Sequence, residues 1–125
     1  MAVLPRPTDA ELQILRVLWE RGPSTVRQVH EAQQRRTSYT TILKLLQIMT
    51  EKGLVNRDES QRSHVYHAKA RREQTQRQLV NDLLERAFGG AADQLVVQAL
   101  SARNVSAAEI AEIRKLIDRL EDADQ

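Results

Sequence analysis

The chain has 125 residues with a net charge of +2, a size typical of a single domain, and 41% hydrophobic residues can form a core. Aromatic residues make up only 3%, so aliphatic side chains must do most of the packing. The lack of cysteine excludes disulfides, thiolate metal sites and cysteine nucleophiles. The sequence contains no run of about 18 apolar residues, so no membrane-spanning segment is predicted. The opening MAVLPRPTDAE lacks the apolar stretch of a signal peptide, so we expect a cytoplasmic protein.

Charge is distributed unevenly along the chain. Residues 1–69 contain 11 Lys/Arg and 7 Asp/Glu, a balance of +4, whereas residues 70–125 contain 8 and 10, a balance of −2. A basic half beside an acidic half is typical of a polyanion-binding element joined to a separate assembly element.

The first helix is predicted over about residues 9–20. Thr8 and Glu11 form a capping box, in which side chains satisfy the free amides at the start of a helix. Leucines follow at helical spacing, and Gly22 with the next proline ends the element.

Two more helices are predicted before residue 54. Ser24 can cap a second helix that extends to about residue 34. Thr37 or Ser38 can cap a third helix, which Gly53 stops.

The third helix has two distinct faces. At about 100° per residue, one stripe faces the core and contains Ile42, Leu45, Leu46 and Met49. The opposite face contains Thr40, Leu43, Lys44 and Gln47. The helix is therefore expected to be firmly seated and to present a short, mostly polar row near its N-terminus.

A hairpin is predicted after the third helix. Residues 54–57 and 64–67 have the composition of strands, and the polar segment 58–63 between them is turn-prone. Three helices followed by a hairpin is the order of a winged helix-turn-helix domain. We therefore predict a mainly α fold with a small β wing, in which residues 1–69 bind duplex DNA.

Residues 70–125 are predicted to be helical and to dimerise. Ser106 and Glu109 form a second predicted capping box. Helices this short bury too little apolar surface to be stable alone, so their apolar faces favour packing against a second copy. The residues expected to form this homodimer contact are Leu79, Leu83, Leu84, Phe88, Leu95, Val96, Leu100, Ile113, Leu116, Ile117 and Leu120.

The chain resembles the penicillinase repressor family of winged-helix regulators, the BlaI/MecI group. The matching motifs are ELQILRVLW, STVRQVHE, SYTTILKLLQIMTEKGLV and HVYHA, followed by FGG and EIAEIRKLI. This resemblance covers nearly the whole chain. It implies a dimeric repressor of inverted-repeat operators that controls antibiotic-resistance or cell-envelope stress genes.

The resemblance also implies a partner and a switch. In the penicillinase branch a membrane sensor protease triggers cleavage of the repressor between Asn and Phe in its C-terminal domain. The aligned pair in this chain is Gln98-Ala99, which departs from the family pattern.

Several side chains are candidates for DNA contacts. Lys44 and the arginines can neutralise phosphates, and hydroxyls at a helix N-terminus favour phosphate too. Gln47 can bond an adenine edge, and Leu43 can lie against a thymine methyl. The full candidate set is Arg27, Ser38, Tyr39, Thr40, Thr41, Leu43, Lys44, Gln47 and Arg62.

Structural alternatives stand beside these assignments. Lys44 and Gln47 could form an ordinary solvated helix face, and Leu43 could pack beneath a neighbouring loop. Tyr39 could be a partly buried anchor, and Arg62 a mobile surface arginine.

Other function classes fit the sequence less well. His64 and His67 would point to opposite faces of a strand, so no metal site is expected, and no cofactor motif stands out. No catalytic constellation is visible, so we do not expect an enzyme. The alternative function is a protein-interaction module that uses a winged-helix scaffold without sequence-specific DNA binding.

Overall fold

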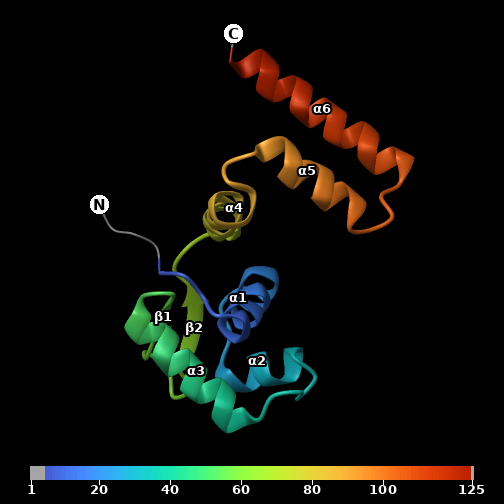
Figure 1. The fold of residues 1–125 in the computed structure, drawn as a ribbon. Coiled ribbons are helices and arrows are strands. Elements are labelled where there is room, and N and C mark those ends of the chain that lie inside the picture. Colours follow the sequence, from blue (N-terminus) through green and yellow to red (C-terminus); the bar gives the residue numbers. More distant parts are fainter. Residues whose placement is uncertain (1–4, 125) are drawn as a thin grey trace. The chain divides into compact units, whose positions relative to one another are not determined.

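The computed structural model describes residues 5–124, which form helices and one two-stranded antiparallel sheet (Figure 1). The helices are α1 (Asp9–Arg21), α2 (Val26–Ala32), α3 (Tyr39–Lys52), α4 (Arg72–Phe88), α5 (Ala92–Ser101) and α6 (Ala107–Ala123). The strands are β1 (Val55–Asp58) and β2 (Val65–Ala68). The predicted mainly α fold with a small β wing is confirmed.

The chain divides into two compact units within α4, between Asn81 and Asp82. This division lies further along the chain than the change of sequence pattern near residue 70. The first turns of α4 therefore belong to the same unit as the winged helix.

The predicted capping box opens α1. The Glu11 amide donates to Thr8 Oγ1 at 3.2 Å, and the Thr8 amide donates to Glu11 Oε1 at 2.8 Å. Two amides that lack partners within the helix are thus satisfied by side chains. At the other end, Gly22 takes a positive φ of 84° and stops α1.

The predicted cap of α2 was wrong by one residue. Thr25, not Ser24, supplies the capping hydroxyl, in a capping box of its own. The helix also ends at Ala32, earlier than expected, because Gln34 and Arg35 adopt left-handed backbone with φ of 57° and 59°. Left-handed residues cannot continue a right-handed helix, and here they make the turn toward α3.

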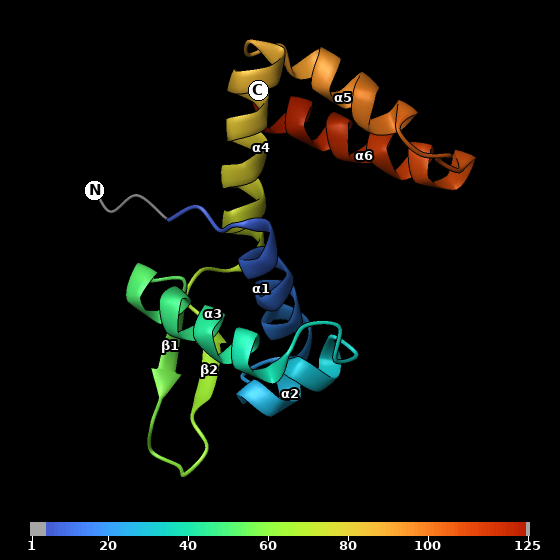
Figure 2. The same ribbon diagram turned by 60° about the horizontal axis from the view of Figure 1, so that its bottom comes forward.

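Ser24 has a different role, because it holds the wing against the helices. Its amide donates to the Tyr66 carbonyl at 2.9 Å, and the Tyr66 amide donates back to the Ser24 carbonyl at 2.8 Å. β2 therefore bonds to the loop before α2 as well as to β1, with Val55 opposite Ala68 in the register. Figure 2 shows the two strands side by side and the loop that joins them.

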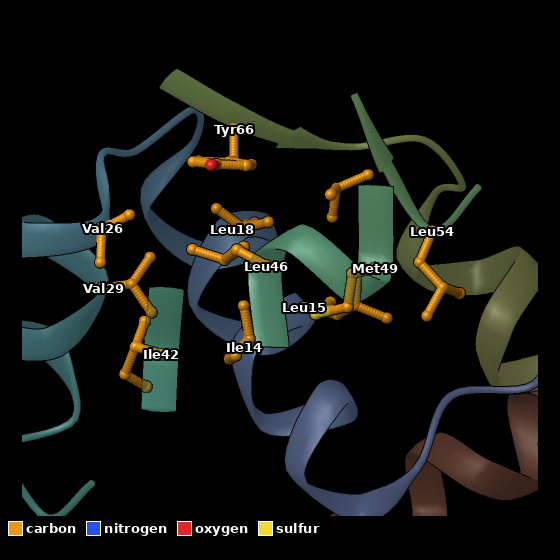
Figure 3. Close-up of a cluster of buried hydrophobic side chains, with 11 residues drawn as sticks. Ile14, Leu15, Leu18, Val26, Val29, Ile42, Leu46, Met49, Leu54 and Tyr66 are labelled. Carbon is orange, nitrogen blue, oxygen red and sulfur yellow. The ribbon is translucent and has the colours of Figure 1, made fainter. Parts of the chain in front are cut away.

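One aliphatic core joins α1, α2, α3 and the hairpin (Figure 3). The predicted core residues Ile42, Leu46 and Met49 are fully buried, and Leu45 packs against them while partly buried. Ile14, which the predicted α1 pattern omitted, is also fully buried. These contacts fix α3 on its inner face and leave its outer face free.

The second unit lacks such a core. No residue of α5 or α6 is buried, although both helices contain many aliphatic side chains. Ser106 Oγ accepts a hydrogen bond from the Glu109 amide at 3.1 Å, which is one of the two hydrogen bonds of the predicted capping box. Within residues 5–124, no helix has both the length and the apolar character needed to cross a membrane.

Candidate nucleic-acid interface

The outer face of α3 presents a row of exposed side chains. Thr40, Lys44 and Gln47 are all exposed, and they lie opposite the buried stripe of the helix. Glu51 is exposed too, one turn after Gln47, and was not anticipated as part of this face. Because an acidic side chain repels phosphate, the part of the row that could lie beside a phosphate is confined to the first two or three turns of α3.

Hydroxyl groups crowd the N-terminus of α3. The predicted choice between Thr37 and Ser38 resolves to Ser38, whose Oγ accepts from the Thr41 amide at 3.2 Å. The Ser38 hydroxyl donates in turn to Thr41 Oγ1 at 2.8 Å. Ser38 is thus used for capping, whereas the hydroxyl proton of Thr41 remains available to an external acceptor.

Of the two interpretations of Leu43, an outward-facing contact or a side chain packed beneath a neighbouring segment, the structure favours packing. Leu43 is partly buried and packs against the hydrophobic core. At 100° per residue it lies on the flank of α3, where the wing and α2 approach the helix. Its remaining exposed surface lines a groove instead of joining the outer row.

This groove, of about 420 Å³, lies between the start of α2, the first turns of α3 and the wing. It brings together four of the predicted contact residues, Arg27, Tyr39, Leu43 and Arg62. The other five, Ser38, Thr40, Thr41, Lys44 and Gln47, lie on α3 or its cap and do not line it. The predicted residues therefore occupy two adjoining surfaces.

The wing adds two exposed polar residues to the groove that the predicted contact set omits, Ser63 and His64. Both are exposed and directly follow Arg62 in the wing. Their position next to Arg62, a predicted contact, is the sequence signal that identifies them. Among the described residues, no group of three or more His, Asp or Glu side chains could hold a metal ion.

Tyr39 is held at the edge of this groove by a ring contact. Its ring meets that of His30 edge-on, with centroids 5.9 Å apart and planes at 85°. Edge-to-face packing is a favoured arrangement for aromatic rings. Tyr39 nevertheless stays 45% exposed, so it is anchored on one side and open on the other.

Two charged residues of the wing have partners within the wing itself. A hydrogen bond with the Tyr66 side chain raises the pKa of Arg57, and the ion pair with Glu59 raises it too. Hydrogen bonds from Ser60, whose amide donates to Asp58 Oδ1 at 2.9 Å, lower the pKa of Asp58. Arg57 and Asp58, at the base of the turn, therefore already have partners within the wing.

Three cations around the α3 row and the groove have no such partner. Within residues 5–124, Arg27, Lys44 and Arg62 have no carboxylate within 4.0 Å. Unpaired cations around a polar groove give the surface a positive potential that attracts polyanions.

The predicted dimerisation residues divide by exposure. Those that are exposed are Leu83, Val96, Leu116, Ile117 and Leu120. Those that are partly buried are Leu79, Leu84, Phe88, Leu95, Leu100 and Ile113. Leu79 belongs to the first unit, where it lines a cavity beside α1.

The predicted cleavage pair, Gln98 and Ala99, lies within α5, and both residues are exposed. Gln98 lines a shallow cavity of about 190 Å³ together with Phe88 and Val97.

Comparisons with known proteins agree with this geometry. Two curated sequences, both named Transcriptional regulator BlaI and from two strains of Mycobacterium tuberculosis, are 35% identical over 124 residues. Each alignment covers 97% of this chain and 89% of the relative. A solved structure from Bacillus licheniformis, the BlaI monomeric form in complex with the blaP half-operator, matches with a TM-score of 0.50 and 25% identity. That match covers 58% of this chain and 92% of the other.

The family profile described as Penicillinase repressor matches residues 7–119, which is most of the chain. The family is one of transcriptional repressors and not of enzymes. Together with the 35% identity to the BlaI regulators, this match shows that the chain belongs to the penicillinase repressor family.

Proposed function

We propose that this chain is a cytoplasmic transcriptional repressor that binds an inverted-repeat operator as a homodimer. One observation carries the proposal: the exposed α3 row adjoins a polar groove, and unpaired cations lie around both. The relative from Bacillus licheniformis is described in complex with a half-operator, which supports the same kind of ligand.

In this proposal α3 enters the major groove. Thr40, Lys44 and Gln47 project together from its outer face, and Gln47 can form two hydrogen bonds to an adenine edge. Lys44 binds a neighbouring phosphate as a point charge. Because the core packs the inner face of α3, this row is held rigidly, which keeps the contacts in register.

The groove beside α3 is the proposed seat of a backbone phosphate. Arg27 and Arg62 approach it from α2 and from the wing, and Ser63 adds a hydroxyl donor. Such contacts position a protein on the duplex without reading sequence. Leu43 lines the groove and provides an apolar patch that a thymine methyl or a sugar could cover.

Dimerisation is supported by the exposed aliphatic side chains of the second unit. Val97, Leu116 and Leu120 are 58%, 53% and 69% exposed. Aliphatic side chains exposed in this number on α5 and α6 are typical of surfaces that a partner covers. Two copies would read two half-sites about 34 Å, or a multiple of this distance, apart along the duplex.

The target genes and the partner that relieves repression are proposed from the family resemblance alone. We propose control of antibiotic-resistance or cell-envelope stress genes, with a membrane sensor protease as the partner that relieves repression. The exposed Gln98-Ala99 pair is the proposed cleavage position. Detection of a fragment ending at Gln98 after induction would support this route.

The test uses duplex selected from a random pool by repeated binding, followed by mobility shift across a salt series. Each phosphate contact contributes about 0.9 to the slope of log affinity against log salt. For Lys44→Ala we expect weaker binding and a slope shallower by roughly 2 per dimer, because each copy loses one contact.

The matched control is Lys115→Ala, which removes the same charge from the exposed face of α6. This variant should keep the wild-type slope. If Lys44→Ala also kept it, the assignment of the α3 face would be wrong. If the wild-type protein bound no duplex even at low salt, the protein-interaction alternative would replace the proposal.

A further inference from the structure

A second cavity, of about 290 Å³, lies in the first unit between α1 and the first turns of α4. It shares no residue with the groove beside α3. The cavity is therefore separate from the proposed DNA interface. Of its lining residues only Leu79 was assigned a role above, as a predicted dimerisation residue, and it belongs to the first unit.

One side of this cavity is apolar. Leu12 and Trp19 of α1 face Leu79 of α4 across it, and all three are only partly buried. The indole of Trp19 is fixed, because its Nε1 donates to the Ala70 carbonyl at 3.0 Å. A fixed aromatic ring with uncovered surface can bind an apolar ligand with little loss of conformational entropy.

The other side is charged. Arg16 of α1 and Arg72 of α4 line the cavity together with Glu20, which gives two positive charges and one negative charge. In the described part of the chain, neither arginine has a carboxylate within 4.0 Å or any other polar partner. Two arginines without partners beside an apolar wall favour a ligand with an anionic head.

We propose that this cavity binds a small amphipathic organic anion. Its apolar body lies against Trp19 and Leu79, and its carboxylate lies between Arg16 and Arg72. The volume is at the lower end of the range of ligand pockets, which selects small ligands over large cofactors. Thr75, whose side chain is almost fully buried at the same wall, adds a polar group beside the ligand.

The chain provides its own reporter, because Trp19 is its single tryptophan. Octanoate is the probe, and octanamide, with the same apolar body and a neutral head, is the matched control ligand. We expect octanoate to give a saturable change in Trp19 fluorescence with a dissociation constant at least about tenfold lower than that of octanamide. Octanoate should also raise the midpoint of thermal unfolding, since it binds only the folded state.

Variants locate the site. Arg72→Gln and Arg16→Gln should each raise the dissociation constant for octanoate about tenfold and leave that for octanamide nearly unchanged. Arg77→Gln is the control on α4 and Arg21→Gln the control on α1, because both remove an exposed arginine outside the cavity lining. Circular dichroism checks that all four variants fold.

Three results would overturn the proposal. One is the absence of any saturable fluorescence change with octanoate. Another is equal affinity for octanoate and octanamide. The third is equal weakening by the cavity and control variants, which would indicate non-specific attraction to a basic surface. Octanoate bound only to the exposed aliphatic side chains of α5 and α6 would leave the Trp19 signal unchanged and would therefore give the first of these results.

Discussion

The ion pair between Glu11 and Lys52 connects the start of α1 to the end of α3. Lys52 Nζ donates to Glu11 Oε1 at 2.7 Å, and the same oxygen accepts from the Thr8 amide. Glu11 is only 2% exposed, whereas the Lys52 side chain is 34% exposed. Substituting Glu11→Gln keeps the shape and the acceptor but removes the charge.

The cost of this substitution can be estimated from the geometry. Breaking a fully buried ion pair costs about 3–5 kcal/mol, and a hydrogen bond to a charged group contributes about 1.5–3 kcal/mol. Solvent reaches Lys52, and glutamine can still accept from Thr8, so the lower values apply. We expect Glu11→Gln to lower the free energy of unfolding by about 1.5 kcal/mol at neutral pH.

The effect should depend on pH. Burial by itself raises the pKa of Glu11, but the hydrogen bonds from Lys52 and from the Thr8 amide outweigh it and lower the pKa overall. A carboxyl whose pKa is lowered on folding stabilises the protein above its ordinary pKa, and this contribution is lost as the pH falls through the lowered value. The difference between wild type and Glu11→Gln should therefore be full at pH 7 and shrink below about pH 4.5.

The assay is urea unfolding followed by Trp19 fluorescence, which reports on the first unit. Glu59→Gln is the control, because its ion pair with Arg57 lies in the same unit and is much more exposed than Glu11, and it should cost less than about 0.5 kcal/mol. If Glu11→Gln cost no more than this control, or if its cost were the same at pH 3.5 and pH 7, the role assigned to the buried pair would be refuted.

Two further predictions concern a helix end and the proposed dimer. Gly53 ends α3 with φ +84°, and a Cβ there would meet only Lys69 Nζ at 4.0 Å, so Gly53→Ala should cost about 1 kcal/mol from backbone strain alone. Asparagine at position 53, which tolerates this backbone, should recover part of that loss in the same urea assay, and equal losses would contradict the strain argument. Leu120→Lys places a charge on a side chain that is 69% exposed in the single chain, so we expect it to leave the fold intact and abolish dimerisation. Sedimentation equilibrium should give twice the chain mass for wild type and the chain mass for the variant, and a monomeric wild type would contradict the dimer.

Local sequence signals predicted the elements well. The Thr8–Glu11 box and Gly22 set the ends of α1, and the spacing of Ile42, Leu46 and Met49 identified the buried stripe of α3. Errors arose where neighbouring signals compete. Ser24 and Thr25 are both good caps, and only the backbone pairing of Ser24 with β2 shows why Thr25 is the one used.

Helix periodicity predicts only part of the candidate site. Thr40, Lys44 and Gln47 share a face that helix periodicity alone defines, and they are exposed as expected. The position of Leu43 depends on how closely α2 and the wing approach α3, which periodicity does not encode. A residue on the flank of a helix can be buried or exposed, depending on what packs beside it.

By itself, the sequence determined the helices, the hairpin and the exposed polar face of α3, because capping, turn chemistry and helical spacing act over a few residues. Only the tertiary structure decided which distant residues meet. It joined Glu11 to Lys52, brought His64 and Arg27 to one groove, and placed Trp19 across a cavity from Leu79. These arrangements bring together residues tens of positions apart. The first two form because burial of the shared core fixes α1, α2, α3 and the hairpin against one another.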